Sequence, residues 1–488
     1  MKILQACAEI FPLLKTGGLA DVAGALPAAL RGQGADVRVL LPGFPAILDG
    51  LESPAQVAEW MSPFDATPVR LLYGALRGCD CSGYVIDAPQ FYQRPGGPYA
   101  DARQQPYEDN HRRFALLGWT AAALAEGLDP YWQAEVVHAH DWHAALAPVY
   151  LRAAAERRGH KVAASVYTVH NLAYQGMFAA HHFGELALPP SYFAVHGLEF
   201  HGQISFMKGG LYFADQLTTV SPTYAGEIQG AEQGCGLDGL LRDRAADLHG
   251  VLNGVDDAVW NPAQDALIPH RYDARRLAGK GRCKAALQAE LGLAAEPDAP
   301  LFCVVSRLAE QKGLHLVLQA LDAITEAGGQ FALLGSGDAG MEAAFQARAQ
   351  AQPQSVAVRI GYDETYAHRL IAGSDVILVP SRFEPCGLTQ LYGLRYGTVP
   401  LVRRVGGLAD TVTDTTLESL DGDANGFVFN DFSADGLISA IRRAFSLWRR
   451  PSRRLEDWHL VQRRGMAARH DWALAAEQYL GIYQRALN

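Results

Sequence analysis

The sequence predicts an α/β protein built from two doubly wound domains, each with a parallel sheet between layers of helices. Short apolar runs alternate with longer amphipathic stretches along the chain, which is typical of strands alternating with crossover helices. A chain of 488 residues exceeds what one ordinary hydrophobic core accommodates, so two domains are expected. The sequence GGLAD also occurs twice, at Gly17–Asp21 and Gly406–Asp410, each time between an expected strand and an expected helix.

Apolar runs and apolar spacing predict the individual elements in chain order. The expected strands of the first half are Lys2–Cys7, Asp36–Leu41, Val85–Asp87, Val136–Ala139, Ala164–Thr168 and Gln216–Val220. Those of the second half are Leu301–Val305, Gln330–Leu334, Val356–Ile360, Val376–Val379 and Val399–Val402. Helical spacing of apolar residues is found in Leu14–Leu30, Asn110–Glu126 and Leu314–Ala327.

Turn residues predict the boundary between the two domains near Val251–Pro262, where VLNGVDDAVWNP carries Asn-Gly, Asp-Asp and Asn-Pro pairs. About 250 residues precede it and about 230 follow it, and each part is long enough for one α/β domain. Ligands of open α/β sheets bind at the carboxyl ends of the strands. We therefore expect the motifs described below to converge in a cleft between the domains.

The composition excludes several function classes. Apolar residues make up 49% and charged residues 19% of the chain, an ordinary globular balance. A formal net charge of −10 argues against a nucleic-acid partner, because no broad basic surface is available to neutralise phosphates. No run of eighteen apolar residues occurs, so no membrane partner or membrane span is expected.

Cysteine usage and the N-terminus predict a cytoplasmic protein. The seven cysteines are scattered and contain no CxxC pair, which favours reduced thiols over a disulfide framework or a zinc site. The N-terminal run MKILQACAEIF resembles a signal peptide only superficially, because Glu9 interrupts it and no A-x-A cleavage site follows. We expect a first buried strand there.

The loop Lys15–Asp21 is the first candidate for phosphate binding. Gly17 and Gly18 allow a ligand to approach the backbone closely, and the free N–H groups of the following helix suit an anion. Lys15 adds a positive charge at the same point. A plain strand-to-helix turn with a solvated lysine explains the same spacing.

The loop Ser306–Gly313 is the second candidate. Arg307 and Lys312 leave one loop after an expected strand, close enough to bind the two phosphates of a diphosphate. A transferase whose leaving group is a nucleoside diphosphate needs such cations, because negative charge grows on that group in the transition state. The alternative is an unremarkable pair of surface cations.

The segment Gly335–Gly340, GSGDAG, is a formal match to the GxGxxG fingerprint of nicotinamide enzymes. That fingerprint also requires an acid after the next strand, whereas this strand ends Arg359-Ile360-Gly361. The sequence therefore favours a tight turn near a nucleotide over a nicotinamide site.

The segment Phe383–Thr389 combines an acid with a helix start. Glu384 precedes Pro385, which disfavours a helical conformation and leaves the carboxylate free to project into the cleft. Gly387, Leu388 and Thr389 are expected to open the next helix with unpaired N–H groups directed at phosphate. Cys386 is expected to be a packed small residue.

Two histidine motifs complete the set: HAHDWH at His138–His143 and HNLAYQG at His170–Gly176. The first resembles a string of metal ligands. A strand end followed by a helix start would, however, orient His138 and His140 differently from His143, and no carboxylate cluster accompanies them, so we expect no metal. His170 and Asn171 are candidates for hydrogen bonds to sugar hydroxyls, and a loop without a ligand is the alternative.

Taken together, these motifs resemble those of the bacterial glycogen synthases. The resemblance is carried, in the same order along the chain, by KTGGLADV (Lys15–Val22), HNLAYQG (His170–Gly176), SRLAEQKG (Ser306–Gly313), EPCGLTQLYGL (Glu384–Leu394), VGGLAD (Val405–Asp410) and DWALAAEQYLGIY (Asp471–Tyr483). It implies the GT-B fold, with two Rossmann-like domains at residues 1–252 and 253–468 and a last helix, residues 469–488, that returns to the first domain. It also implies transfer of glucose from ADP-glucose to the non-reducing end of glycogen or a maltooligosaccharide, with retention of configuration and without a metal or other cofactor.

The resemblance further implies roles for individual residues. The implied catalytic residues are Lys15, Asp141, His170, Arg307, Lys312 and Glu384. The implied donor-binding residues are Lys15, Gly17, Gly18, Asn171, Asn253, Arg307, Gln311, Lys312, Gly361, Tyr362, Glu384, Cys386, Gly387, Leu388 and Thr389. The implied acceptor-binding residues are Asp21, Tyr99 and Tyr174.

One position departs from related retaining transferases, which often carry a second glutamate eight residues after the first. Here that position is Tyr392, and the glycogen synthases are similar to this sequence there, so the departure narrows the family. Because no nucleophile stands out in the sequence, we expect the acceptor hydroxyl to attack from the face on which the leaving group departs. Such an attack retains the α configuration. A double displacement would use Asp141 as the nucleophile.

Other functions stay open at this point. A glucosyltransferase that uses UDP-glucose, or one of the starch synthase type, would carry the same motifs, although a plant starch synthase would begin with a transit peptide. A glucan phosphorylase would need a pyridoxal phosphate lysine and resembles a much longer chain. A catalytically silent glucan-binding protein would not need every polar residue of the motifs.

Overall fold

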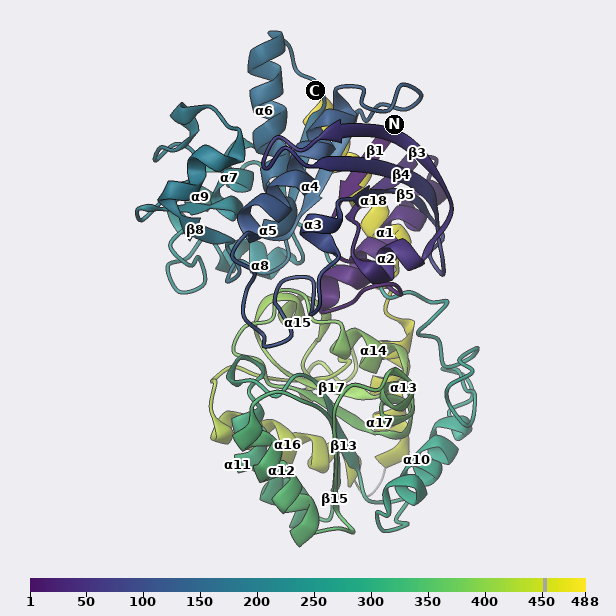
Figure 1. Cartoon of the computed structure of the whole chain (residues 1–488). Helices are drawn as coiled ribbons and strands as arrows, with labels where there is room; N and C mark the ends of the chain where they lie inside the picture. The colour runs from purple at the N-terminus through teal and green to yellow at the C-terminus, as the bar shows by residue number, and fades with distance from the viewer. Residues whose placement is uncertain (451–453) are drawn as a thin grey trace. The chain divides into compact units, whose positions relative to one another are not determined.

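The computed structural model of the chain describes residues 1–450 and 454–488. The chain forms two compact units, one of residues 1–254 together with 472–488 and one of residues 255–471. Both units are built around a mainly parallel sheet with helices on both faces (Figure 1).

The first unit contains a nine-stranded sheet with the order β12-β11-β7-β6-β1-β2-β5-β4-β3. Seven strands are parallel, and β4 and β3 extend one edge as an antiparallel hairpin. The bounds are β1 (Lys2–Ala6), β2 (Asp36–Pro42), β3 (Leu51–Met61), β4 (Pro68–Leu76), β5 (Ser82–Asp87), β6 (Val136–His140), β7 (Ala164–Val169), β11 (Gln216–Thr219) and β12 (Leu248–Gly250). A separate small sheet has the order β8-β10-β9, with β8 (Met177–Ala179), β9 (Glu199–Phe200) and β10 (Gln203–Ser205).

The helices of the first unit connect these strands. They are α1 (Gly18–Gly32), α2 (Pro45–Asp49), α3 (Pro89–Tyr92), α4 (Asn110–Ala125), α5 (Asp141–Ala144), α6 (Leu146–Arg158), η1 (Ala180–Leu186), η2 (Pro190–Tyr192), α7 (Phe206–Phe213), α8 (Pro222–Glu227), α9 (Asp238–Asp243) and α18 (Trp472–Leu487). In the described parts of the chain, no helix has the length and apolar character that crossing a membrane requires.

All six strands predicted in the first half exist, with ends that differ by a few residues. The hairpin β3–β4 was not predicted, because most residues of β3 are exposed and its sequence lacks an apolar run. The helix predicted from Leu14 begins only at Gly18. Its first turn does not form because Leu14 pairs with Ile10 and the Glu9 carboxylate accepts a hydrogen bond from the Thr16 N–H at 2.6 Å.

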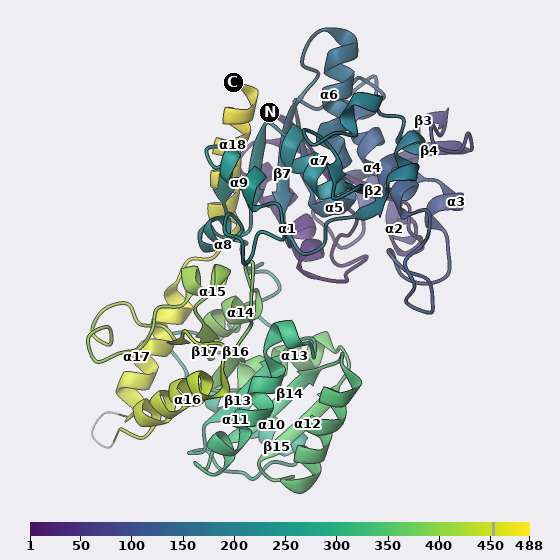
Figure 2. The same ribbon diagram turned by 90° about the vertical axis from the view of Figure 1, so that its left-hand side faces the viewer.

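The C-terminal helix α18 is part of the first unit, where it packs against α1 and β7 (Figures 1 and 2). Apolar residues of both helices and of the adjacent face of the sheet form one core, which includes Ile3, Val22, Leu26, Trp472 and Tyr479. The helix is also joined to the sheet by a buried hydrogen bond of 2.8 Å between Tyr483 Oη and His138 Nδ1.

The second unit contains a six-stranded, fully parallel sheet with the order β15-β14-β13-β16-β17-β18. Numbered within the unit, this is the order 3-2-1-4-5-6 of the Rossmann fold. The strands are β13 (Leu301–Val305), β14 (Gln330–Gly335), β15 (Val356–Ile360), β16 (Val376–Val379), β17 (Val399–Arg403) and β18 (Phe427–Phe429). The helices are α10 (Ala278–Leu291), η3 (Glu310–Lys312), α11 (Leu314–Thr325), α12 (Ala339–Ala351), α13 (Glu364–Gly373), α14 (Thr389–Arg395), α15 (Gly406–Thr411), α16 (Ala434–Trp448) and α17 (Arg454–Ala467).

Alternate residues of each strand in this sheet face two different cores. Phe302 and Val304 of β13 pack in the core that includes α11, α12 and α16, whereas Leu301 and Cys303 pack in the core that includes α10, α13 and α14. Figure 1 shows the two sets of helices on opposite sides of the sheet. Because both faces are covered, the strands are continuous apolar runs, which can be recognised in the sequence. All five strands predicted in this half are confirmed.

The anchor of α18 leads to a stability prediction. Replacing Tyr483 with Phe removes the hydroxyl and leaves Nδ1 of the buried His138 without its partner, so we expect the free energy of unfolding to fall by about 1–3 kcal/mol. Urea unfolding followed by circular dichroism measures this change. Replacing the neighbouring exposed Gln484 with Ala should change it by less than about 0.5 kcal/mol; equal effects of the two variants would contradict the anchoring role.

Candidate functional site

The carboxyl ends of β13 and β16 form the topological switch point of the second sheet, where the strand order reverses and ligands of such folds bind. A pocket with about 400 Å³ of empty space opens there. It is lined by residues of the strand ends and of the loops that follow them, among them Ser306, Lys312, Ser381, Glu384, Gly387, Leu388, Thr389 and Gln390.

Two of the predicted site residues, Lys312 and Glu384, meet in this pocket. Lys312 Nζ lies 2.9 and 2.7 Å from the two carboxylate oxygens of Glu384. Ser381 Oγ donates a further hydrogen bond of 2.8 Å to Glu384 Oε2. Glu384 is only 7% exposed, so its charge requires these partners. The sequence predicts that Lys312 binds phosphate; the structure adds that its ammonium group pairs with Glu384.

Backbone contacts fix the loop that carries Lys312. Gly313 has φ +71°, and a Cβ at this position would lie 2.1 Å from the carbonyl oxygen of Pro380. The Arg382 N–H donates to the Gln311 carbonyl oxygen at 2.8 Å. The loop after β13 is therefore held against the loop after β16 by close packing that only glycine permits.

Arg307 has a different environment from Lys312. Arg307 is exposed, and its guanidinium forms no ion pair within residues 1–450 and 454–488. Because Lys312 pairs with Glu384 and Glu310 pairs with Arg382 at 3.4 Å, Arg307 is a cation of this loop that no carboxylate in the described chain compensates.

The segment after Glu384 has the predicted form. The helix α14 begins at Thr389, with Leu388 as its N-cap residue. Gly387 has φ +73°, and its carbonyl oxygen accepts a hydrogen bond from Gln390 Nε2 at 2.7 Å. Cys386 is buried, as expected for a packed residue.

The glycines of the GSGDAG segment have a structural explanation. A Cβ at Gly335 would lie 1.9 Å from the carbonyl oxygen of Ser306, and one at Gly337 would lie 2.3 Å from that of Leu308. Close packing against the loop after β13 thus requires both glycines. On the neighbouring strand end, Gly361 has φ +126°, and Tyr362 is 71% exposed with its hydroxyl bonded to Glu364.

In the first unit, Asp141 is the central acid. It begins α5 directly after β6 and adopts φ +56°, a conformation that Asp and Asn tolerate better than other side chains. Its Oδ1 accepts hydrogen bonds from the backbone N–H groups of His170 at 2.9 Å and Asn171 at 3.4 Å. Burial outweighs these bonds and raises the pKa of Asp141 to about 7. The structure thus brings the predicted residues Asp141, His170 and Asn171 together.

The four histidines around Asp141 have different ring contacts. Nδ1 of His138 bonds Tyr483 Oη, and Nε2 bonds Thr168 Oγ1 at 2.6 Å. His140 Nδ1 lies 3.0 Å from His170 Nε2, and His143 stacks on Tyr99 with a centroid distance of 4.6 Å. Burial lowers the pKa of all four rings, so they are neutral.

The loop after β1 carries a second group of predicted residues. Lys15 Nζ pairs with Asp21 Oδ1 at 2.9 Å. Glu9, which is 3% exposed, accepts hydrogen bonds from the Thr16 N–H and hydroxyl and from the hydroxyl of Tyr99. Glu9 therefore joins the loop that contains Gly17 to Tyr99.

Sequence reasoning missed Glu9 and Ser381, which hold the predicted residues in place. A signal for Glu9 existed, because a carboxylate directly after an apolar strand is costly to bury unless it has partners. For Ser381 no comparable signal exists, since serine is common in loops.

The side chains of Tyr174 and Asn253 form no hydrogen bond with another predicted residue within the described chain. Tyr174 is 53% exposed, and its N–H donates to the carbonyl oxygen of Asn171. Asn253 is buried, and its Oδ1 has no hydrogen-bond partner within the described residues.

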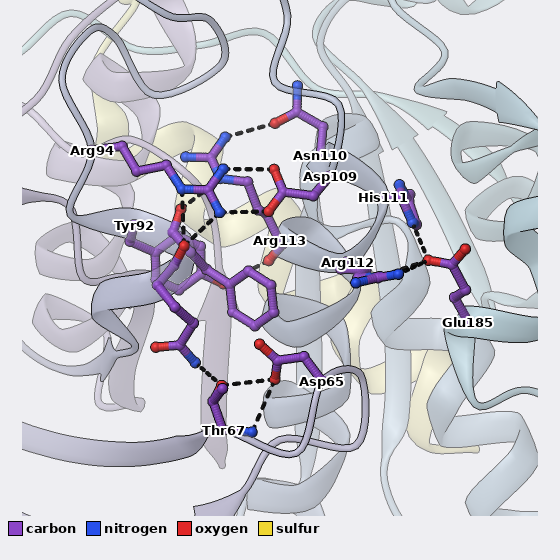
Figure 3. Close-up of polar contacts among 12 residues, drawn as sticks. Asp65, Thr67, Tyr92, Arg94, Asp109, Asn110, His111, Arg112, Arg113 and Glu185 are labelled. Carbon is purple, nitrogen blue, oxygen red and sulfur yellow. Dashed lines mark hydrogen bonds and ion pairs between the residues drawn. The ribbon is translucent and has the colours of Figure 1, made fainter.

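A further polar cluster links α4 to η1 (Figure 3). Glu185 accepts from Arg112 Nε at 2.6 Å and bonds His111 Nε2 at 2.8 Å and His182 Nδ1 at 3.0 Å. The spacing of these two histidines and the carboxylate would suit a metal ion. The guanidinium of Arg112 already neutralises the carboxylate, however, so the cluster links the two elements without needing a further cation. Nδ1 of His111 has no hydrogen-bond partner within the described residues.

Comparisons with known proteins agree with this architecture. The family model described as starch synthase catalytic domain matches residues 2–243, and the one described as glycosyl transferases group 1 matches residues 292–457. The chain is 70% identical to a glycogen synthase of Leptothrix cholodnii over 99% of both chains, and 61% identical to one of Variovorax paradoxus over 100% of this chain and 99% of that protein.

Two solved structures are also similar. The catalytic domain of starch synthase IV from Arabidopsis thaliana, bound to ADP and acarbose, has a TM-score of 0.89 at 32% identity and matches over 100% of this chain and 99% of that chain. A sucrose-phosphate synthase from Thermosynechococcus elongatus, with a TM-score of 0.57 and 16% identity over 99% of this chain and 98% of that chain, shares the fold alone. The GT-B fold of two Rossmann-like domains is thereby confirmed.

The pKa of Asp141 leads to a prediction about pH. Burial raises the pKa of the Asp141 carboxyl from the ordinary 3.8 to about 7 in the folded protein. The contribution of Asp141 to stability therefore falls as the pH rises between these values. Asn keeps the uncharged form, tolerates φ +56° and still accepts from the His170 N–H.

We therefore expect the free energy of unfolding of Asp141→Asn, relative to the original protein, to rise between pH 4 and pH 7, by at most about 4 kcal/mol. Urea unfolding of both proteins at several pH values measures it. A difference that stays constant over this range would contradict the raised pKa.

Proposed function

This chain belongs to the glycogen synthase family of glucosyltransferases, and we propose that it transfers glucose from ADP-glucose to the non-reducing end of an α-1,4-glucan with retention of configuration. ADP as the nucleotide and a glucan as the acceptor are supported by the similar starch synthase, whose structure is described as bound to ADP and acarbose. The proposed reaction needs no metal and no organic cofactor.

The observation that carries this proposal is the arrangement at the switch point of the second sheet. Glu384 is buried and neutralised by Lys312, while Arg307 leaves the same loop without an ion-pair partner in the described chain. A diphosphate brings negative charge into such a site and needs at least one cation that no carboxylate already neutralises. Arg307 fits this requirement.

We assign Lys312 a second role that depends on Glu384. Lys312 compensates the charge of the buried Glu384 carboxylate. Glu384 can therefore face the donor and accept hydrogen bonds from hydroxyls of the sugar or the ribose. Lys312 remains close enough to contact phosphate through a third N–H, since an ammonium group carries three.

The remaining donor contacts are assigned to residues around the same strand ends and to the first unit. In the second unit they are Gln311, Gly361, Tyr362, Cys386, Gly387, Leu388 and Thr389, with Tyr362 next to the adenine. In the first unit they are Lys15, Gly17, Gly18, Asp141, His170, Asn171 and Asn253. Acceptor contacts are assigned to Asp21, Tyr99 and Tyr174.

The proposed chemistry is attack by the acceptor hydroxyl on the face from which ADP departs. The leaving phosphate oxygen takes the proton of the attacking hydroxyl, and Arg307 stabilises the charge that grows on the diphosphate. A double displacement would instead use Asp141 as a nucleophile. The raised pKa of Asp141 disfavours this route, because a carboxylate that holds its proton near pH 7 is a weak nucleophile; a trapped glucosyl–Asp141 adduct would establish it.

A donor assay tests the proposed function directly. The purified protein is mixed with glycogen and either ADP-glucose or UDP-glucose in buffer containing EDTA, and release of the nucleoside diphosphate is followed. Fast release of ADP with growth of the glucan is the expected result. Turnover of UDP-glucose alone would change the donor, and no turnover with either donor by folded protein would overturn the function.

The role of Arg307 gives a sharper prediction. Because Arg307 is exposed and has no partner in the described chain, Arg307→Ala should leave the free energy of unfolding within about 0.5 kcal/mol. Its kcat should fall about 100-fold or more, the usual effect of losing one group that stabilises transition-state charge. Steady-state kinetics with ADP-glucose measure this, and Arg282→Ala, which removes an exposed cation of α10, is the matched control.

Lys312→Ala should behave differently from Arg307→Ala, since it leaves the buried Glu384 unpaired and lowers stability as well as activity. An Arg307→Ala variant with nearly normal kinetics would contradict the assigned role of Arg307.

A further inference from the structure

The ring contact between His140 and His170 fixes the position of one proton. His140 is the last residue of β6, and His170 follows β7, the neighbouring parallel strand. Nδ1 of His140 lies 3.0 Å from Nε2 of His170. At this distance one nitrogen donates and the other accepts, so two arrangements of the protons exist.

Burial keeps both rings uncharged, because it lowers the pKa of His140 well below its ordinary value and lowers that of His170 as well. Each neutral ring carries one proton. The choice of donor therefore also decides which nitrogen of each ring is left without a proton.

The two arrangements differ at Nε2 of His140, which is buried and has no hydrogen-bond partner within the described residues. If His170 donated, the proton of His140 would lie on Nε2 as a buried N–H without an acceptor. If His140 donates, this atom carries only a lone pair. Orphaned buried N–H groups are rarer in proteins than under-satisfied acceptors, so the second arrangement is favoured.

We propose that His140 donates its Nδ1–H to Nε2 of His170 and thereby holds His170 in the tautomer whose proton is on Nδ1. His140 is then a positioning residue, and His170 can only donate through Nδ1. That atom has no partner in the described chain and is not among its buried unpaired atoms, so it is accessible to a ligand. The ligand group that fits is an oxygen lone pair, such as that of a sugar hydroxyl.

This inference rests on the proposed function only for the identity of the ligand, glucose. It gives His170 and Asp141 complementary roles. His170 offers a side-chain donor, and the Asp141 carboxyl is held beside it by the His170 backbone N–H at 2.9 Å. A sugar hydroxyl can accept a hydrogen bond from Nδ1–H of His170 and still donate its own proton to another partner.

His138 provides the matched control, because it has the same strand, direction and burial but other partners. Its ring lies 4.0 Å from that of His140, yet its nitrogens bond Tyr483 and Thr168. A change at His138 therefore disturbs the packing of His140 without removing a bond to His170.

Nuclear magnetic resonance of the full chain labelled with ¹³C and ¹⁵N in histidine tests the tautomer directly. Ring ¹⁵N and ¹³Cδ2 shifts distinguish a proton on Nδ1 from one on Nε2, and the His170 signals are assigned by their loss in His170→Asn. We expect the original protein to show the proton on Nδ1. His140→Asp, whose carboxylate accepts and does not donate, should move it to Nε2, whereas His140→Asn, whose amide N–H replaces Nδ1–H, and His138→Asn should leave it on Nδ1.

Kinetics then test whether the tautomer matters. His140→Asp should lower kcat/KM for the donor about tenfold, the usual effect of losing one hydrogen bond, and His140→Asn should keep most of the original value. A proton on Nε2 in the original protein, a His170 signal that does not respond to His140→Asp, or normal kinetics in that variant would each overturn the proposal. The tautomer is measured without substrate, so failure of the proposed function would leave that result unchanged.

Discussion

Burial of the Glu384 carboxylate is the constraint on which the second unit depends. Glu384 is almost fully enclosed at the carboxyl end of β16, and removing a charge from water costs several kcal/mol unless partners replace the water. Lys312 and Ser381 provide those partners. Because Lys312 comes from the loop after β13, the same ion pair joins the two loops that flank the switch point. Both members of the pair also line the pocket between these loops.

The first unit also buries a carboxyl group, but without an ion pair in the described chain. Asp141 is buried beside neutral histidines, and its partners are the backbone N–H groups of His170 and Asn171. Those bonds are too weak to offset burial, so the carboxyl holds its proton to about pH 7. The two units therefore present different chemistry. The second has a compensated charge and, nearby, the Arg307 cation, which has no ion-pair partner in the part of the chain that the structure describes. Around Asp141, the first has largely neutral donors and acceptors. The neutral groups of the first unit suit the hydroxyl groups of a sugar, and the cation of the second unit suits a charged leaving group.

Much of the fold could be predicted from the sequence, because strands buried on both faces are continuous apolar runs. The edge hairpin β3–β4 lacks that signal and was missed, because β3 is mostly exposed and β4 alternates between buried and exposed residues. The site residues were found from their types and their places after strands, but their contacts were not. Nothing in the sequence indicates that Lys312 pairs with Glu384, 72 residues later, since this depends on which strands are neighbours. The contact of His140 with His170 depends on the register of β6 and β7 and was missed for the same reason.

The repeated GGLAD sequence shows how one pattern arises from two physical causes. In the second unit, a Cβ at Gly406 would lie 1.9 Å from the carbonyl oxygen of Glu384, and one at Gly407 would lie 2.1 Å from that of Cys386. Packing alone therefore requires glycine at both positions, and the repeat holds the Glu384 loop in place. In the first unit, a Cβ at Gly17 would meet no atom within 4 Å, and its backbone is extended, as any residue allows. Neither packing nor conformation within the described chain gives a reason for glycine there. Close approach of a phosphate to the N–H groups at the start of α1, as the proposed function requires, would supply that reason.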